Sequence, residues 1–447
     1  GNYYLKDDKL LFQCSITDGD YDKTLISFDP VSCDRQNPLE CVEALKQVIL
    51  GFLITEVNPE LNLQETPPRF EAYEYFINAK ANIANDQVYL DLLNKAIEAD
   101  STYFEAKVDR ALYYYNAREF RIADSLIGRI VPNSINSTRQ INLLNQNKAL
   151  LNGNNKKAYT YIQQEYNYAP FHLETNSGAM VVTLQYVNKP EKIDSLFNFI
   201  PMEKMNLETC TFCKFRYYIQ GLALNELKQY NKTQQLLAPV IEQSEDYYLK
   251  IPLIAALVRS GNFAKLDDLL NRIHLTADGA TLSAASLFAG KECLLKGDTE
   301  KASLYFDKVL ANESLEIPTV EMASAYYYKK DFDTAVSILE KLLTDDPENH
   351  SLLSKLAVSY AKIGNQEKSD DTLRRLEKSR SDYQYGSVDY AYAQFFAATG
   401  NKDKALQHLL LSIANGNSYT PNTYQNDPHF KAYHDNQAFK NILTFWH

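Results

Sequence analysis

The chain has 447 residues, of which 45% are hydrophobic, which is enough to fill a continuous core. Its formal net charge is −11 and its pI is about 5.3. This acidic balance argues against direct nucleic-acid binding by this segment, because phosphate contacts need clustered Lys and Arg. The best apolar stretch, 48–54, is far shorter than the ~18 residues of a membrane-spanning helix.

Residues 1–57 predict a small α/β subdomain. Apolar segments near Tyr3 and over 10–16 flank a polar turn, which is typical of a β-hairpin, and residues 24–28 favour a further strand. A helix is expected over 38–54, with Pro38 in its first turn. Its predicted buried side consists of Val42, Leu45, Val48, Ile49 and Phe52. Because a lone hairpin is marginal in water, we expect that this subdomain is partial or docks on the first repeat.

The chain opens with Gly rather than Met. We interpret this glycine as the scar of a cleaved tag on a fragment of a longer protein. Residues 58–68, which contain three prolines, are the expected linker to the next domain.

Cys33 and Cys41 flank a polar loop beside the predicted helix. A disulfide there would close a short loop and pin a weak subdomain if the chain resides in an oxidising compartment. We favour the alternative interpretation, in which both residues are free thiols and Cys41 packs on the helix. The disulfide remains an open candidate. Cys14 is a further candidate partner.

From residue 69 to 416 a pattern of about 34 residues recurs, clearest over 316–347, with the spacing of a tetratricopeptide unit. Such a unit consists of two antiparallel helices joined by a short turn. Small residues mark the close crossing in the first helix: Ala111, Gly221, Gly290, Ala323, Ala357 and Ala393. Glycines mark the turn: Gly153, Gly261, Gly297, Gly364 and Gly400. Small residues recur in the second helix: Ala123, Ala158, Ala302, Ala335 and Ala405. We therefore predict a mainly α fold, a right-handed tetratricopeptide superhelix of nine or ten helix pairs.

In such repeats the first helix of each unit lines the concave face, which has no built-in active site. The residues expected on this face are aromatic and sparsely charged: Tyr115, Tyr218, Asn225, Lys291, Tyr327 and Tyr390, with Arg259 and Tyr328 beside them. We expect them to bind a protein, a peptide or a second copy of the chain, by stacking and backbone hydrogen bonds. The alternative, that these tyrosines pack against adjacent repeats, stays equally open.

Sequence motifs of catalysis and metal binding, such as a glycine-rich phosphate loop or His-Glu-x-x-His, are absent. Cys210 and Cys213 have the spacing of a redox or zinc half-site but begin a predicted repeat helix and lack a second cysteine pair. We interpret them as two half-buried thiols. His429 and His434 are five residues apart and share no helix face. We predict no enzymatic activity, no metal site and no cofactor.

Residues 417–447 are expected to form a helical cap. Asp427 and Asp435 each precede a short segment whose first turn a carboxylate can cap. A terminal repeat has an exposed apolar side that needs covering. The residues predicted to cover it are Phe430, Phe439, Ile442, Leu443 and Trp446. Ligand binding is the less favoured role of this segment.

Several segments together resemble a recurring bacterial arrangement, a TolB-type amino-terminal domain followed by tetratricopeptide repeats. They are the hairpin with 27–29, and then 70–76, 95–100, 426–430 and 435–439. In that family the module follows a winged-helix DNA-binding domain, an adenylate cyclase or a Ser/Thr kinase, often with a membrane helix between.

The resemblance implies a non-enzymatic interaction or sensor region of a bacterial signalling or transcriptional regulator. It would lie on the extracytoplasmic (periplasmic) side of a membrane-anchored parent and be tied to the membrane only through a missing upstream helix. The alternative is a cytoplasmic adaptor or regulatory tail attached to a kinase or an adenylate cyclase.

Overall fold

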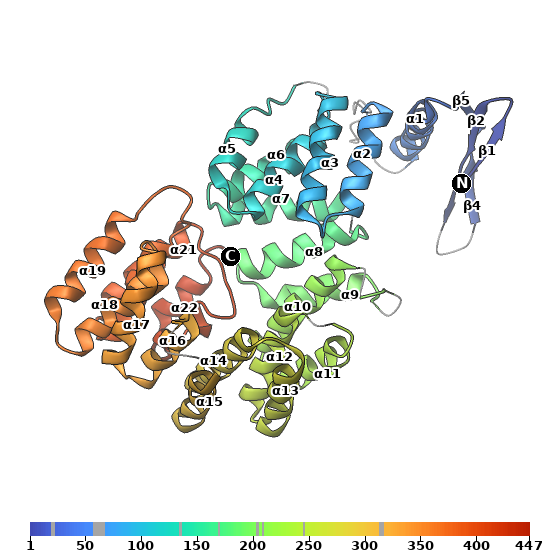
Figure 1. Cartoon of the computed structure of the whole chain (residues 1–447). Coiled ribbons are helices and arrows are strands. Elements are labelled where there is room, and N and C mark those ends of the chain that lie inside the picture. Colours follow the sequence, from blue (N-terminus) through green and yellow to red (C-terminus); the bar gives the residue numbers. More distant parts are fainter. Residues whose placement is uncertain are drawn as a thin grey trace. The chain divides into compact units, whose positions relative to one another are not determined.

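The computed structural model describes residues 1–18, 23–56, 68–133, 136–168, 170–202, 205–207, 210–244, 246–312 and 317–447 (Figure 1). It is mainly helical and divides into two compact units, Gly1–Leu151 and Asn152–His447. The predicted linker 58–68 lies outside the described residues except for Pro68. Among the helices that are described, none combines the length and the hydropathy that crossing a bilayer requires.

The described part of the first unit begins with five short strands: β1 (Asn2–Lys6), β2 (Lys9–Gln13), β3 (Ser15–Asp18), β4 (Lys23–Ser27) and β5 (Val31–Asp34). An antiparallel sheet has the order β1-β2-β5, and β3 pairs separately with β4. Asp7 and Asp8, with φ of 50° and 60°, form the two-residue turn between β1 and β2. Positive φ at both turn residues matches the twist of a hairpin, so the predicted hairpin is confirmed.

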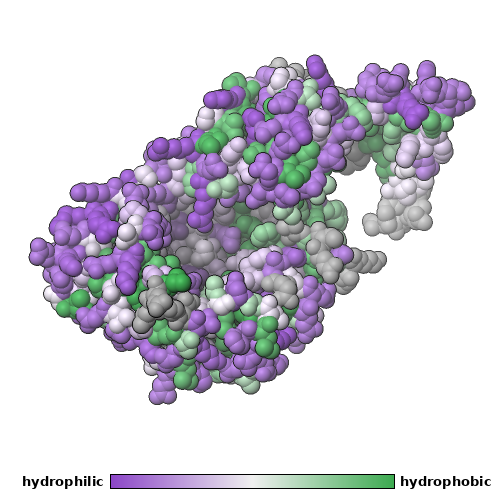
Figure 2. Space-filling model, in the orientation of Figure 1, coloured by the Kyte–Doolittle hydropathy of each residue, from purple (hydrophilic) through white to green (hydrophobic). Residues whose placement is uncertain are grey.

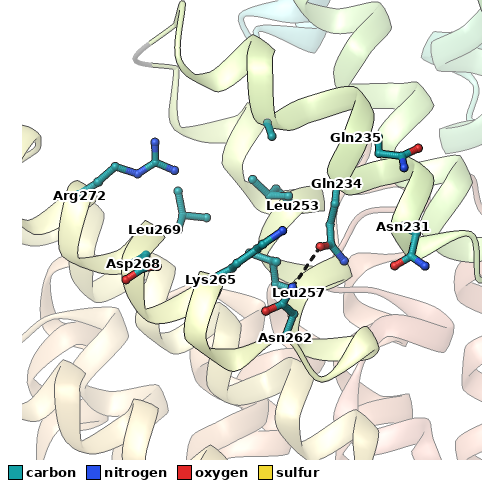
Figure 3. A pocket seen from close by; sticks show the side chains of 11 residues that line it. Asn231, Gln234, Gln235, Leu253, Leu257, Asn262, Lys265, Asp268, Leu269 and Arg272 are labelled. Carbon is teal, nitrogen blue, oxygen red and sulfur yellow. Dashed lines mark hydrogen bonds between the residues drawn. The ribbon is translucent and has the colours of Figure 1, made fainter.

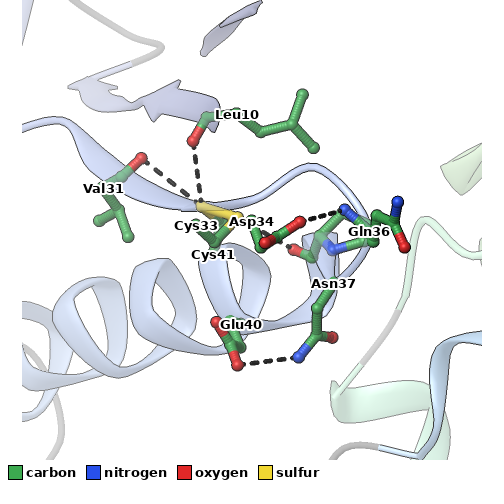
Figure 4. The surroundings of a disulfide bond; sticks show 9 residues. Leu10, Val31, Cys33, Asp34, Gln36, Asn37, Glu40 and Cys41 are labelled. Atoms are coloured by element: carbon green, nitrogen blue, oxygen red, sulfur yellow. Dashed lines mark hydrogen bonds between the residues drawn. A yellow bond between two sulfur atoms is a disulfide. The ribbon is translucent and has the colours of Figure 1, made fainter. Parts of the chain in front are cut away.

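Helix α1 (Pro38–Glu56) follows and packs on β2 and β5. Cys33 of β5 and Cys41 of α1 form a disulfide (Figure 4). The Cys41 sulfur lies 3.6 Å from the carbonyl oxygens of Leu10 and Val31. The bond stands in place of the free thiols favoured from the sequence, because the first turns of α1 lie directly on the strand that carries Cys33.

The predicted buried side of this helix is wrong for Val42 and Val48, which are 47% and 44% exposed. The sheet meets α1 on the side of the fully buried Cys41. Leu45 and Ile49 are partly buried, and the side chain of Phe52 lies outside the described residues.

Antiparallel helix pairs make up the rest of both units. The first unit contains α2 (Phe70–Ala81), α3 (Asp86–Ala99), α4 (Phe104–Asn116), α5 (Phe120–Gly128) and α6 (Thr138–Leu151). The second unit begins with α7 (Asn155–Tyr168), α8 (Leu173–Val181), the π-helical segment η1 (Val182–Tyr186), η2 (Pro190–Lys192) and α9 (Ile193–Phe199). It continues with α10 (Thr211–Glu226), α11 (Tyr230–Ile241), α12 (Tyr247–Ser260), α13 (Phe263–Thr276), α14 (Gly279–Lys296) and α15 (Thr299–Asn312). Then come α16 (Val320–Lys329), α17 (Phe332–Asp345), α18 (His350–Lys362), α19 (Gln366–Lys378), α20 (Ser387–Thr399) and α21 (Lys402–Ala414). The last elements are η3 (Tyr424–Asn426), η4 (Pro428–Tyr433) and α22 (Gln437–Leu443).

The small residues of the predicted repeat stand where helices cross. A Cβ added to Gly290 would lie 2.3 Å from the Phe306 ring, and one added to Gly221 would lie 2.7 Å from Leu237. Ala323, Ala357 and their counterparts are fully buried or nearly so. All five predicted turn glycines have positive φ, between 62° and 95°. The helix pairs of the structure therefore recur with the period that was identified in the sequence.

The pair Cys210 and Cys213 also departs from the sequence interpretation. The structure joins these residues in a disulfide at the start of α10, in place of two half-buried thiols. The first turn of a helix brings residues i and i+3 together, which is the separation of this pair.

We predict that Gly290→Ala lowers the free energy of unfolding by about 1–3 kcal/mol, because the new methyl group must displace the Phe306 ring. Gly178→Ala in α8 is the matched control, since its added Cβ would lie 3.6 Å from the nearest atom, which is ordinary contact. The control should be neutral or slightly stabilising. Urea unfolding of both variants measures the difference in stability. Equal stabilities would contradict the close packing of Gly290 against the Phe306 ring.

We also predict the number of reactive thiols. The chain has six cysteines, and Cys14 and Cys293 are the free ones in the structure. Alkylation of the denatured, unreduced protein should therefore add two labels, and alkylation after reduction should add six. Mass spectrometry reads both numbers. Four or six labels before reduction would mean that one or both disulfides do not form.

Candidate functional site: the inner helices and the C-terminal segment

The first helices of successive pairs lie side by side in the second unit. α10 contacts α8 and α12, α14 contacts α12 and α16, and α18 contacts α16 and α20. These seven helices are called the inner helices below. They carry most of the predicted binding residues: Tyr218 and Asn225 on α10, Arg259 on α12, Lys291 on α14, Tyr327 and Tyr328 on α16, and Tyr390 on α20. Tyr115 is on α4 in the first unit, where its ring meets the Phe120 ring edge-on at 5.4 Å.

Residues 417–447, called the C-terminal segment below, lie against the inner helices. Four predicted residues bond to it: Lys291 Nζ to Asn422 Oδ1 (2.6 Å), Arg259 Nη2 to Asn426 Oδ1 (2.7 Å), Tyr390 OH to Asp427 Oδ2 (2.9 Å) and Tyr327 OH with His429 Nε2 (2.7 Å). The Tyr328 ring lies 6.0 Å from the His429 ring. In this structure, the partner of the predicted binding residues is thus a segment of the same chain.

The other two predicted residues of this unit, both on α10, pack against the neighbouring helices α11 and α12. Asn225 donates to the carbonyl oxygen of Pro252 at 2.7 Å and accepts from Thr233 at 2.9 Å. Tyr218 meets Tyr248 edge-on at 5.5 Å. Burial raises the pKa of Tyr218 above its usual range. Packing between repeats, the alternative left open by the sequence, describes these two side chains.

Asp427 is the most densely bonded group of the C-terminal segment. Its carboxylate is 1% exposed and accepts from Tyr390, Gln394 and both the backbone N–H and Nδ1 of His429. Burial alone would raise the pKa of Asp427, but His429, Lys291 and the hydrogen bonds outweigh it and hold the pKa well below its usual range. A buried charge is stable only when it is paired and bonded in this way.

Arg259 organises a second buried network. Its guanidinium binds Glu292 in a bidentate manner at 2.7 and 2.9 Å and lies 3.5 Å from Glu226. Glu226 accepts from Tyr419 at 3.0 Å and from Asn426 at 3.0 Å. Burial lowers the pKa of Arg259, but the two glutamates more than offset this and raise it. The network thus ties α10, α12 and α14 to the C-terminal segment.

Two lysines on the inner helices, Lys291 and Lys355, have pKa values that burial lowers. Burial lowers the pKa of Lys291, and Asp427 and Glu292 offset part of the shift. Burial and the charge of Lys291 together lower the pKa of Lys355 to about 8. Lys355, on α18, donates to Ser351 at 2.8 Å and was not identified from the sequence.

Apolar anchors hold the C-terminal segment in the core. Phe430 is 0% exposed, Phe439 is 1% exposed and Ile442 is also buried, while Leu443 and Trp446 pack partly buried against the same core. This core includes residues of α10, α12, α14 and α20 as well as Leu409 and Ile413 of α21. The predicted role of the segment was to cover the last repeat. In the structure it covers that repeat and also packs in the core formed by α10, α12, α14 and α20.

The ends of the second unit meet. Gly416 packs on Gly153, since a Cβ added to Gly416 would lie 2.5 Å from the Gly153 Cα. Asn155 Nδ2 donates to the Gly416 carbonyl at 3.4 Å. Asn188 Nδ2 donates to Leu443 O at 3.1 Å, and His447 Nε2 lies 3.1 Å from Asn188 O. The C-terminal segment thus closes this unit on its first helices.

The predicted helix caps of the segment are correct in one of two cases. Asp427 accepts from the N–H of His429 at the start of η4. At α22 the cap is Asn436, which accepts from Phe439 N at 3.1 Å, and the predicted cap Asp435 is exposed. The helix begins one residue later than predicted, and Asn caps a helix as well as Asp does.

Asp427, His429 and Tyr327 form a hydrogen-bonded chain that has the residue types of an acid–base relay. Nδ1 of His429 donates to Asp427 at 2.6 Å, and its Nε2 lies 2.7 Å from the hydroxyl oxygen of Tyr327. Tyr327 is only 6% exposed, and burial raises its pKa above its usual range. Their hydrogen bonds hold the C-terminal segment against α16 and α20.

Two hollows border these elements. One, of about 380 Å³, lies where Glu226, Arg259 and Lys296 face Gln425 and His434 of the C-terminal segment. The other, of about 660 Å³, lies between α11 and α13 over α12 (Figure 3). Within the described residues, no group of three or more His, Cys, Asp or Glu side chains could hold a metal ion.

Comparison with known proteins gives one family match and several distant structural likenesses. A family model described as the TT21 fifth ARM repeats domain matches residues 316–418, which include α16 to α21. No curated protein matches the chain. Three similar solved structures are a tetratricopeptide repeat protein from Parabacteroides merdae, the APC/C hetero-tetramer Cut9–Hcn1 and the pentatricopeptide repeat protein PPR10 with an 18-nucleotide psaJ RNA element.

These three structures are remote from the chain. The first is 12% identical with a TM-score of 0.31, covering 66% of this chain and 99% of that chain. The second is 14% identical with a TM-score of 0.32, covering 88% and 82%. The third is 12% identical with a TM-score of 0.36, covering 90% and 66%. The family match over 316–418 and the observed helix pairs together show that the chain contains an ARM/TPR-like helical repeat domain.

We predict that Asp427→Ala lowers the free energy of unfolding by about 2–5 kcal/mol, because it leaves buried donors on Tyr390, Gln394 and His429 without their acceptor. The exposed Asp435→Ala is the control and should change stability by less than about 0.5 kcal/mol. Chemical unfolding measures both. Similar effects of the two substitutions would show that the segment is not anchored through Asp427.

The pH dependence follows from the depressed pKa of Asp427 in the folded protein. The unfolded carboxyl titrates near ~4, so its stabilisation is fully present above that pH and is lost as the pH falls. Below about pH 4 the wild type should therefore lose stability more steeply than Asp427→Asn. Parallel stability curves of the two proteins between about pH 2 and pH 5 would contradict this assignment.

Proposed function

We propose that the chain is a non-enzymatic protein-binding scaffold whose partner docks in the groove between α11 and α13. One observation supports this choice above others: the C-terminal segment covers the inner helices with buried anchors, whereas the groove on the outer side is open. Stacked helix pairs serve as binding scaffolds because each added pair extends the surface that a partner can contact. Binding at the predicted inner-face residues would first require displacement of the segment.

The groove has an apolar floor and a polar rim. Leu253 and Leu257 of α12 form the floor, and Leu269 of α13 borders it (Figure 3). The rim consists of amide and charged side chains: Asn231, Gln234, Gln235, Asn262, Lys265, Asp268 and Arg272. Gln234 and Asn262 meet across the groove at 3.5 Å. A volume of about 660 Å³ lies in the range of specific ligand sites.

This lining suits an extended peptide. Amide side chains offer both donors and acceptors, and they can pair with peptide backbone. The leucine floor can take one apolar side chain, and exposed Lys265 and Arg272 favour an acidic residue beside it. On the face shown in Figure 2, hydrophobic areas are small and separated by hydrophilic ones, which supports recognition through a confined groove.

We further propose the biological setting that the resemblance implies, an interaction or sensor region of a membrane-anchored bacterial signalling or transcriptional regulator. The small strand region before the repeats supports a TolB-type domain there. The two disulfides of the described residues support an extracytoplasmic location, because disulfides persist in oxidising compartments. The net charge of −11 supports a protein partner, or a second copy, over nucleic acid. The cytoplasmic adaptor stays the alternative.

A random peptide library displayed on phage tests the groove. We predict that selected peptides carry an apolar residue next to an acidic one, and that Arg272→Glu weakens their binding at least tenfold through charge repulsion. The exposed Lys341→Glu on α17 makes the same charge change away from the groove and should leave Kd unchanged.

Isothermal calorimetry on the full chain measures these affinities. If selected peptides bind Arg272→Glu and the wild type equally, the groove is not the site. If the library yields no binding peptide at all, the proposal of a peptide-binding scaffold fails.

A further inference from the structure

The disulfide between Cys210 and Cys213 stands at an unusual place in the repeat. Cys210 is the N-cap residue of α10, and its sulfur accepts from the backbone N–H of Cys213 at 3.2 Å. Cys210 is partly exposed, whereas Cys213 is 0% exposed. Of the two cysteines, only Cys210 is in contact with solvent.

The start of a helix favours a thiolate at this position. The free N–H groups of the first turn and the helix dipole stabilise negative charge there, and they lower the pKa of a cysteine at a helix N-terminus below that of a free thiol. In the disulfide-bonded structure the N–H of Cys213 already points at the Cys210 sulfur. The same N–H group is in place to stabilise a thiolate on Cys210 after reduction.

A buried cation lies farther along the same helix. Arg216, one helical turn beyond Cys213, is 0% exposed and donates to the carbonyl oxygens of Phe197 at 2.5 Å and Ile200 at 3.4 Å. Burial lowers its pKa to about 10, so the guanidinium stays charged at neutral pH. The guanidinium is directed toward the backbone carbonyl groups at the end of α9.

The other disulfide lacks these features. Cys33 lies in β5 and Cys41 in α1, and they are 6% and 0% exposed. Neither sulfur is presented to solvent, and Cys41 faces two backbone carbonyl oxygens, which disfavour a thiolate. This bond has the environment of a structural cross-link, and it provides an internal reference in the same chain.

We propose that Cys210 and Cys213 form a thiol–disulfide exchange site, whose substrate class is an accessible dithiol or disulfide of another protein or of a small thiol. This activity goes beyond a binding scaffold and does not depend on the groove.

In the reductive direction, a substrate thiolate attacks the Cys210 sulfur and forms a mixed disulfide. Cys213 leaves as a thiolate and takes up a proton. A second substrate thiolate then attacks the substrate sulfur of the mixed disulfide, and Cys210 leaves as a thiolate. The cysteine pair gains two electrons, and two substrate thiols become one disulfide. The reverse sequence oxidises the pair.

Redox titration of the full-length wild-type chain tests the proposal. The protein is equilibrated in buffers of reduced and oxidised glutathione, quenched with acid and alkylated, and mass spectrometry reads each cysteine. Cys210–Cys213 should be half reduced at a ratio of reduced to oxidised glutathione at least tenfold lower than Cys33–Cys41 requires. It should also react with dithiothreitol at least tenfold faster. Equal or slower reduction would overturn the proposal, as would failure to form this disulfide in excess oxidised glutathione.

The thiolate itself gives a second measurement. In Cys213→Ser, iodoacetamide should modify Cys210 with a pH midpoint at least one unit below the ~8.5 of a free cysteine, and the variant should trap glutathione on Cys210. A midpoint at or above ~8.5 would overturn the assignment. If this variant does not fold, the alkylation rate of Cys210 in the fully reduced wild type supplies the same midpoint.

Discussion

The second unit depends on the burial of one irregular segment against its inner helices. Stacked helix pairs leave an inner face that each pair can only partly cover, and here residues 417–447 fill it with Phe430, Phe439 and Tyr419, each at most 1% exposed. Apolar burial of this kind supplies most of the stabilisation that such a segment can contribute. Without it, the facing sides of α10, α14 and α20 would lose their contacts together.

Burial of the segment also brings polar groups into the core, and their bonding sets its register. Asp427 and the pair of Arg259 with Glu292 are costly groups to bury, and each is compensated by several hydrogen bonds. A segment shifted by one residue would leave these charges without partners. The polar contacts therefore contribute positional accuracy, while the aromatic side chains contribute most of the net stability.

Occupation of the inner face changes what this scaffold can do. A repeat array with an empty concave face offers a long channel to a partner, whereas this unit presents its second helices and the grooves between them. The groove over α12 is one such place, and its amide-rich rim differs chemically from the aromatic inner face. The cysteine pair at the start of α10 lies on another element and acts through sulfur chemistry, so binding and exchange need not interfere.

The sequence by itself determined the repeat. The spacing of Gly290, Ala323 and Ala357 and of the turn glycines follows from the local geometry of crossing helices and left-handed turns, so it is readable without any tertiary information. It also identified most of the inner-face residues and the apolar anchors of the C-terminal segment, since helical position alone puts Tyr327 and Tyr390 on the first helices. Asp427 as a helix cap was likewise predictable from its place before Pro428.

Only the tertiary structure decided what those residues contact. Tyr327 meets His429 and Lys291 meets Asn422 across more than a hundred residues, and no local pattern encodes a pairing at that separation. Cys33 and Cys41 are only eight residues apart, and the sequence offered them as a candidate pair, but whether they bond depends on how α1 lies on β5. Periodicity reports which face of a helix a side chain occupies. Whether solvent, a partner or a distant part of the chain covers that face is set by how the whole array closes.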